Sequence, residues 1–335
     1  MLMKEVVSNV YTLLDREYLT LGEEVLQVDD GKIIADTVYS AVSPGTEKAA
    51  WLGKTPLRPC KQYPRLQGYC NLARVRSVGK DVEGIEVGDY ILTHQSHRSV
   101  VVVNEQDILV RFSQLDEEHQ KDVCLTYLFH LGYSALLKSE FFPGHKVAII
   151  GCGALGYTTA SLLSSFGAKP TIVTSKTELA VDKFSGDSVS VLNKKEALAP
   201  SANSGFDIII NTSDSWEDYV IGLELLRAGG VCVLLGFPGR GESSPDFNPL
   251  MSRLMYDKQL SVRYAGYVCE SEQNMQDVRF TLKRNMNYLA SLILDKKLST
   301  SALNQLVMPF SELSDLYQLL VKRETNSLTG ILKWS

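Results

Sequence analysis

The feature that most limits how this chain can fold is a glycine motif, Gly151-Cys152-Gly153-Ala154-Leu155-Gly156. A G-x-G-x-x-G spacing is a weak signal when it occurs alone. Here an apolar run at 147–150 precedes the motif and a helical pattern at 155–166 follows it, which is the setting of a dinucleotide-binding turn. In such a turn the first glycine permits a tight bend, the second lets the backbone approach a pyrophosphate, and the third lets the helix pack on the strand. We therefore predict a dinucleotide site at this motif. The alternative is a glycine-rich turn without a ligand.

From Lys146 onward, short apolar runs alternate with helical stretches, a pattern typical of a parallel sheet. We predict a doubly wound α/β unit of six strands, in which Gly229-Gly230 closes the helix before one of them. The strands that can be placed lie at 147–150, 171–174, 206–210, 231–235 and 260–264.

The residues on either side of this unit have a different pattern. Residues 1–123 carry glycines between apolar runs, as expected of a β-rich domain with tight turns. The last part of the chain, 269–335, contains helical stretches at 287–294 and 311–320 and a closing strand at 331–334. We therefore predict three segments, with boundaries at 123/124 and 268/269.

Composition narrows the class of partner. The net charge is only -5 and charged residues make up 22%, so nothing suggests a basic surface for nucleic acid. No apolar run approaches the roughly 20 residues that cross a bilayer, and the first residues lack the apolar stretch of a signal peptide. Six scattered cysteines are typical of reduced thiols. We expect a cytoplasmic protein that acts on a small molecule.

The choice of cofactor depends on the residues after the second predicted strand, Thr174-Ser175-Lys176-Thr177. An NAD site usually carries an Asp or Glu there for the ribose hydroxyls. In this chain Ser175 and Thr177 can donate hydrogen bonds and Lys176 can supply positive charge to a 2′-phosphate. The pattern favours NADP(H). The alternative is that Lys176 is solvated and that Glu178 is recruited by NAD.

The order of the segments resembles the medium-chain dehydrogenases and reductases. That family has a GroES-like β-rich catalytic domain, a Rossmann domain and a C-terminal return to the first domain. The residues that carry the resemblance are Val78-Gly79-Lys80-Asp81-Val82, Val87-Gly88-Asp89-Tyr90-Ile91 and Gly132-Tyr133-Ser134-Ala135-Leu136. The stretch Ser43-Pro44-Gly45-Thr46-Glu47 is similar to the S-x-G-T-E segment of a subgroup that includes bacteriochlorophyllide dehydrogenase-like proteins and oxidoreductases of polysaccharide or natural-product gene clusters.

This chain differs from the zinc-containing members of the family at the positions of their metal ligands. By the resemblance, their catalytic cysteine falls near Pro44-Gly45, their G-H-E motif near Gly68-Tyr69-Cys70 and their third ligand near Tyr127. A catalytic zinc site needs three nitrogen, sulfur or carboxylate ligands, so we predict no metal. The alternative is a site formed by His94, His97 and Glu47.

Without zinc, a proton donor must stabilise the alkoxide that develops during carbonyl reduction. Tyr69 is the first candidate, because it stands where the family places a ligand. Glu47 and His97 are alternatives or relay partners. Each of the three also has a purely structural interpretation: Tyr69 as a wall of the pocket, Glu47 as a helix cap and His97 as a support of its loop. The resemblance further implies that residues of several loops face the cofactor: Thr46, Thr212, Gly236, Phe237 and Tyr267.

Three functions therefore remain open. The first is carbonyl reduction or alcohol oxidation on a polar small molecule. The second is reduction of an activated carbon–carbon double bond or a quinone, and the third is a non-catalytic NADPH sensor. The resemblance also implies a homodimer joined through the Rossmann domains, because residues 260–267 occupy the place of the edge strand that meets a partner.

Overall fold

The computed structural model describes residues 4–57, 62–184, 189–199, 205–266 and 280–334, which form two compact units. Unit 1 comprises residues 1–127 and 269–335, and unit 2 comprises residues 128–268. The helix α3 (Thr126–Ser139) begins at the end of the first stretch of unit 1. No helix in the described part of the chain is long and apolar enough to span a membrane.

Unit 2 contains a parallel sheet of six strands in its described residues, in the order β11-β10-β9-β12-β13-β14. This confirms the predicted doubly wound sheet. Strand β9, in the middle of the sheet, is buried at every position, which accounts for the unbroken apolar run at 147–150 in the sequence. The strands are β9 (Val147–Ile150), β10 (Thr171–Thr174), β11 (Ser190–Asn193), β12 (Phe206–Asn211), β13 (Leu226–Leu234) and β14 (Ser261–Tyr264).

The helices of unit 2 connect these strands. They are α4 (Ala154–Ser165), α5 (Thr177–Lys183), α6 (Lys194–Ala197), α7 (Trp216–Leu225) and α8 (Ser252–Met255). The prediction that Gly229-Gly230 ends a helix is wrong, because α7 stops at Leu225 and both glycines lie within β13. The reason is tertiary. The ammonium group of Lys258 donates hydrogen bonds to three carbonyls there, those of Leu223, Glu224 and Leu226.

Unit 1 is β-rich, as predicted, and its described strands form two sheets. The larger has the order β15-β16-β3-β5-β6-β8, with β7 also paired to β3, and the smaller has the order β2-β1-β4. The strands are β1 (Lys4–Asp15), β2 (Tyr18–Val28), β3 (Ile33–Ala41), β4 (Arg65–Leu66), β5 (Cys70–Val78), β6 (Tyr90–Thr93), β7 (Val100–Val103), β8 (Ile108–Phe112), β15 (Val307–Pro309) and β16 (Ile331–Lys333).

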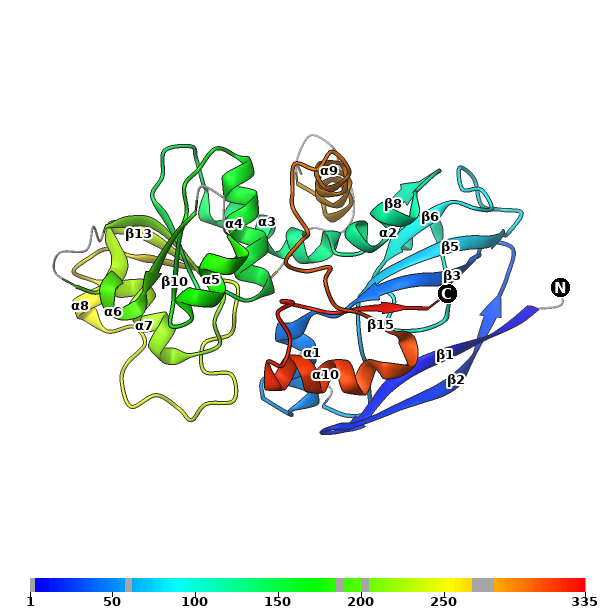
Figure 1. The fold of residues 1–335 in the computed structure, drawn as a ribbon, viewed down its shortest axis with the longest axis horizontal. Coiled ribbons are helices and arrows are strands. Elements are labelled where there is room, and N and C mark those ends of the chain that lie inside the picture. Colours follow the sequence, from blue (N-terminus) through cyan, green and yellow to red (C-terminus); the bar gives the residue numbers. More distant parts are fainter. Residues whose placement is uncertain (1–3, 58–61, 185–188, 200–204, 267–279, 335) are drawn as a thin grey trace. The chain divides into compact units, whose positions relative to one another are not determined.

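The C-terminal segment completes unit 1 (Figure 1). Strand β16 pairs antiparallel with β3, and the buried leucines of α10 pack with Trp51 of α1 in one apolar cluster. The closing strand is thus confirmed, and so are both helical stretches. Residues 287–294 lie within α9, which begins at 282, and residues 311–320 lie in the 3-10 helix Phe310–Glu312 and in α10. The helices of this unit are α1 (Pro44–Trp51), α2 (Glu117–Val123), α9 (Leu282–Leu294) and α10 (Leu313–Lys322).

Candidate active site

Tyr69 lies just before β5, and the residue preceding it determines how closely the chain can pass over His97. Gly68 has a φ of +86°, a conformation that favours glycine, and a Cβ atom there would lie 2.7 Å from the imidazole ring of His97. The tight approach places the half-buried ring of Tyr69 near the start of α1, 26 positions earlier in the chain.

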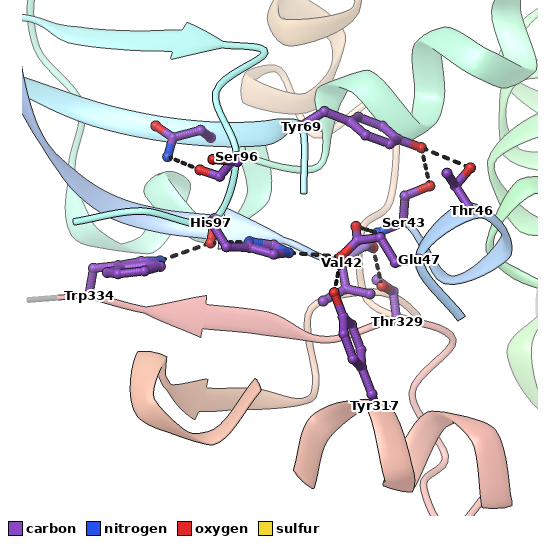
Figure 2. Close-up of polar contacts among 12 residues, drawn as sticks. Val42, Ser43, Thr46, Glu47, Tyr69, Ser96, His97, Tyr317, Thr329 and Trp334 are labelled. Atoms are coloured by element: carbon purple, nitrogen blue, oxygen red, sulfur yellow. Dashed lines mark hydrogen bonds and ion pairs between the residues drawn. The ribbon is translucent and has the colours of Figure 1, made fainter. Parts of the chain in front are cut away.

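The phenol of Tyr69 is held by two hydroxyl groups, one from Ser43, the residue before α1, and one from Thr46 in its first turn. It donates a hydrogen bond to Ser43 Oγ, and Thr46 Oγ1 lies 3.4 Å from the phenol oxygen (Figure 2). Burial raises the pKa of Tyr69, and the hydrogen bonds with Ser43 and Thr46 oppose that rise only in part. The phenol is therefore protonated at neutral pH and can act as a donor.

Glu47 is buried behind this pair and has its own set of partners. Its Oε1 accepts a hydrogen bond from the backbone N–H of Ser43 at 2.6 Å. Its Oε2 lies 2.9 Å from Nε2 of His97 and accepts the phenol hydrogen of Tyr317 at 2.6 Å (Figure 2). Only 1% of Glu47 is exposed, and three donors share its two oxygens. This arrangement agrees with a structural or relay role more readily than with direct contact to a substrate.

His97 is likewise fully buried, with 0% exposure. Its Nδ1 lies 2.8 Å from Ser40 Oγ, and the same oxygen accepts a hydrogen bond from the indole of Trp334 at 2.8 Å. All these contacts are satisfied if Nε2 donates to Glu47 and Nδ1 accepts from Ser40. Burial raises the pKa of Tyr317 well above its ordinary value, so its phenol also remains a donor to Glu47.

A group of aromatic rings borders Tyr69 on its other side. The ring centroids of Tyr69 and Tyr127 are 5.4 Å apart, and those of His94 and Tyr127 are 4.5 Å apart, both edge to face. His94 Nδ1 also lies 3.2 Å from the carbonyl oxygen of Tyr69. His94 is thus engaged with Tyr127 and Tyr69, while His97 and Glu47 contact each other.

The metal alternative receives no support from the described residues. No group of three or more His, Cys, Asp or Glu side chains in that part of the chain could hold a metal ion. The four described cysteines are buried and unpaired, and burial raises the pKa of their thiols; they are Cys70, Cys124, Cys152 and Cys232.

The glycine motif of unit 2 has the geometry of a dinucleotide turn. Gly151 has a φ of +102°, and a Cβ there would lie 2.7 Å from Thr212 Oγ1. A Cβ on Gly156 would lie 2.3 Å from the carbonyl oxygen of Gly151, so the helix can pack this closely only without a side chain. Around Gly153, the residue before α4, a Cβ would meet nothing within 4 Å among the described residues. Ala154 and Leu155 are the first residues of α4. The open space at Gly153, just before this helix start, fits a pyrophosphate.

Other predicted cofactor residues lie at the carboxyl ends of the strands of unit 2. Ser175 is exposed and Lys176 directly precedes α5, while Glu178 is exposed in its first turn. Thr212 Oγ1 donates a hydrogen bond to the carbonyl of Ile150 at 2.8 Å.

The loop after β13 packs closely on the loop after β12. A Cβ on Gly236 would lie 2.3 Å from the carbonyl oxygen of Ser213, and the backbone N–H of Phe237 donates to Asp214 at 2.9 Å. The predicted cofactor residue Tyr267 lies outside the described residues.

The sequence did not single out Ser43 or Tyr317. Ser43 belongs to the S-x-G-T-E stretch, and this position could have been recognised as the residue before a helix with Pro at its first position. Tyr317 carries no comparable signal, because it meets Glu47 from 270 positions away.

Comparison with known proteins gives distant relatives, and no protein-family model matches the chain. A mannitol dehydrogenase of Apium graveolens is 27% identical over 212 residues, which are 62% of this chain and 55% of the relative. An NADP-dependent alcohol dehydrogenase C 1 of Mycolicibacterium smegmatis is 28% identical over 165 residues, 48% of this chain and 46% of the relative. The chain thus spans about half the length of these relatives.

Solved structures match over nearly the whole chain. L-idonate 5-dehydrogenase from Escherichia coli has a TM-score of 0.77 at 14% identity and covers 99% of both chains. A candidate zinc-binding dehydrogenase from Sinorhizobium meliloti, solved with NADP, has a TM-score of 0.74 at 17% identity, covering 98% of this chain and 99% of its own. An alcohol dehydrogenase from Escherichia coli, solved with NADH, has a TM-score of 0.75 at 13% identity, covering 98% and 99%.

At these identities the structures show the fold alone. They confirm the predicted fold class, a Rossmann sheet of six parallel strands together with a GroES-like β-rich domain. The chain is thus similar in sequence to dehydrogenases and has the fold of the medium-chain dehydrogenases and reductases.

Proposed function

We propose that this protein is an NADP(H)-dependent oxidoreductase that interconverts a carbonyl group and an alcohol on a polar small molecule without a catalytic metal. The observation that carries the proposal is the phenol of Tyr69, which is protonated, half-buried and held by Ser43 and Thr46. A hydrogen-bond donor held in this way can stabilise an oxygen as it becomes negatively charged.

Unit 2 is proposed to carry the cofactor and unit 1 the proton donor. The turn at Gly151, Gly153 and Gly156 would hold the pyrophosphate, and Ser175 with Lys176 would hold the 2′-phosphate. When bound, the nicotinamide supplies or accepts a hydride. In the reducing direction Tyr69 then gives its proton to the substrate oxygen, and in the oxidising direction it takes that proton back.

Metal independence is proposed on the chemistry of the side chains that surround Tyr69. The resemblance aligns Tyr69 and Tyr127 with ligand positions of the zinc enzymes, and a neutral phenol such as that of Tyr69 is a poor zinc ligand. Glu47 and His97 are already saturated by hydrogen bonds within the unit.

The experiment is a spectroscopic assay of NADPH consumption with separate panels of ketones and aldehydes, enones, and quinones. We expect turnover on the carbonyl panel and its loss in Tyr69→Phe. Turnover confined to enones or quinones and unaffected by Tyr69→Phe would favour double-bond reduction. Tight NADPH binding without turnover on any panel would favour a sensor.

A further inference from the structure

Ser43 has no role in the function proposed above beyond accepting a hydrogen bond, yet its surroundings give it a second use. Only 4% of the residue is exposed, and its Oγ accepts the hydrogen of the Tyr69 phenol. Among the described residues no other acceptor takes the hydrogen of the Ser43 hydroxyl. That hydroxyl can therefore rotate and donate to Tyr69 when the phenol has lost its proton.

We propose that Ser43 is the positioning residue that stabilises Tyr69 as a phenolate, by reversing the direction of their hydrogen bond during the reaction. The inference rests on the proposed function, in which Tyr69 gives its proton to the substrate oxygen. The hydride from the cofactor forms the new C–H bond, the phenol proton forms the new O–H bond, and the phenolate is left behind. The Ser43 hydroxyl then donates to the phenolate oxygen until a water molecule returns a proton and leaves as hydroxide.

The physical reason is the cost of a charge in a half-buried place. Burial disfavours the phenolate, whereas a hydrogen bond donated to it favours the charged form. Thr46 offers a second hydroxyl, but its oxygen lies 3.4 Å away and its residue is half-exposed. Ser43 makes the closer contact and is buried, so it carries most of the stabilisation.

The buried carboxylate of Glu47 explains why Ser43 is fixed in this position. Oε1 of Glu47 accepts the backbone N–H of Ser43, and Oε2 is anchored by His97 and Tyr317. In the described residues no hydrogen bond joins the Ser43 hydroxyl to Glu47. The carboxylate of Glu47 therefore does not accept the proton of that hydroxyl. Glu47 acts on Tyr69 through the position of the Ser43 backbone.

The test replaces Tyr69 by a fluorinated tyrosine whose phenol ionises near neutral pH, and follows its ionisation by fluorine NMR without cofactor or substrate. Ser43→Ala is compared with Ser43→Thr, which keeps the hydroxyl, and with Thr46→Val, which removes the more distant one. We expect Ser43→Ala to raise the pKa of the fluorinated phenol by about 1 unit, a roughly ten-fold change in its ionisation constant. Ser43→Thr should shift it by a third of that or less, and Thr46→Val by less than Ser43→Ala.

A Ser43→Ala value unchanged from the parent, or a shift smaller than that of Thr46→Val, would overturn the inference. The Ser43 side chain makes no capping hydrogen bond to α1, so its removal leaves the helix start intact, and Ser43→Gly serves as a second variant without the hydroxyl. The titration needs no turnover. It therefore stands apart from the proposed function, which fails if Tyr69→Phe retains carbonyl reduction.

Discussion

At the scale of single residues, the phenol of Tyr69 is the group on which the proposed chemistry depends. Tyr69→Phe removes the hydroxyl while keeping the ring that packs against Tyr127. Loss of a donor to a developing oxyanion costs about 3–4 kcal/mol in the transition state, so turnover should fall about a hundred-fold or more. NADPH affinity, measured by fluorescence titration, should change little.

The matched control for this experiment is Tyr127→Phe, which removes the hydroxyl of the neighbouring ring. Its turnover should stay much closer to that of the parent. If Tyr69→Phe keeps its turnover within about three-fold, Tyr69 only shapes the pocket, and His97→Gln and Glu47→Gln become the next variants to assay. An equal absence of effect there would leave double-bond reduction with protonation by solvent as the better account.

Gly68 is a second single residue with a measurable role. Gly68→Ala combines a positive φ with a Cβ that would lie 2.7 Å from the His97 ring, so we expect a loss of about 2–4 kcal/mol in the free energy of unfolding. Gly84→Ala is the control, because Gly84 has a φ of +73° but open space around the added atom. Denaturant unfolding of both variants measures the difference. Equal losses would show that backbone strain alone matters and that the approach to His97 does not.

At the scale of elements, the end of β10 and the start of α5 should select the cofactor. Lys176 directly precedes α5 and could pair with a 2′-phosphate. We expect the protein to bind NADPH more tightly than NADH, and Lys176→Ala to weaken NADPH binding by about ten-fold, equivalent to roughly 1–2 kcal/mol. Binding of NADH should be unchanged. Superimposable titration curves for the two cofactors in the parent protein would contradict this prediction.

At the scale of the whole molecule, metal content is the first property that can be measured. We expect purified protein to contain no stoichiometric zinc and a chelator to leave both unfolding and turnover unchanged, because the resemblance aligns Tyr69 and Tyr127, which are poor zinc ligands, with two of the ligand positions of the zinc enzymes. Elemental analysis gives the answer directly. About one zinc ion per chain would overturn metal-independent catalysis.

The second whole-molecule property is the oligomeric state. Strand β14 ends the six-stranded sheet, and Tyr264 on this edge is 66% exposed. Proteins usually cover such an edge, so we predict a homodimer joined through unit 2. Light scattering at micromolar concentration should give twice the mass of the chain. The mass of a single chain would refute the dimer.

The sequence was most informative where structure depends on neighbours along the chain. The glycine spacing at 151–156 predicts a turn in which Gly156 packs on the carbonyl of Gly151, five residues earlier, and the apolar runs predict strands that are buried on both faces. The end of α7 could not be predicted from the local sequence, because the carbonyls there accept hydrogen bonds from the ammonium group of Lys258, 32 to 35 positions away. The sequence named three candidates, Tyr69, Glu47 and His97. It could not show that Tyr69 is half-buried whereas Glu47 and His97 are fully buried.

The sequence by itself therefore determined the class of fold and the glycine turn at 151–156, because both follow from local periodicity and from the small size of glycine. Only the tertiary structure decided which candidate can act as a donor. It brought Ser43 to Tyr69 across 26 positions, and His97 and Tyr317 to Glu47 across 50 and 270 positions. Burial and hydrogen bonding then separated a phenol with a half-exposed ring from a carboxylate whose oxygens are fully occupied, and such differences depend on contacts that no local pattern records.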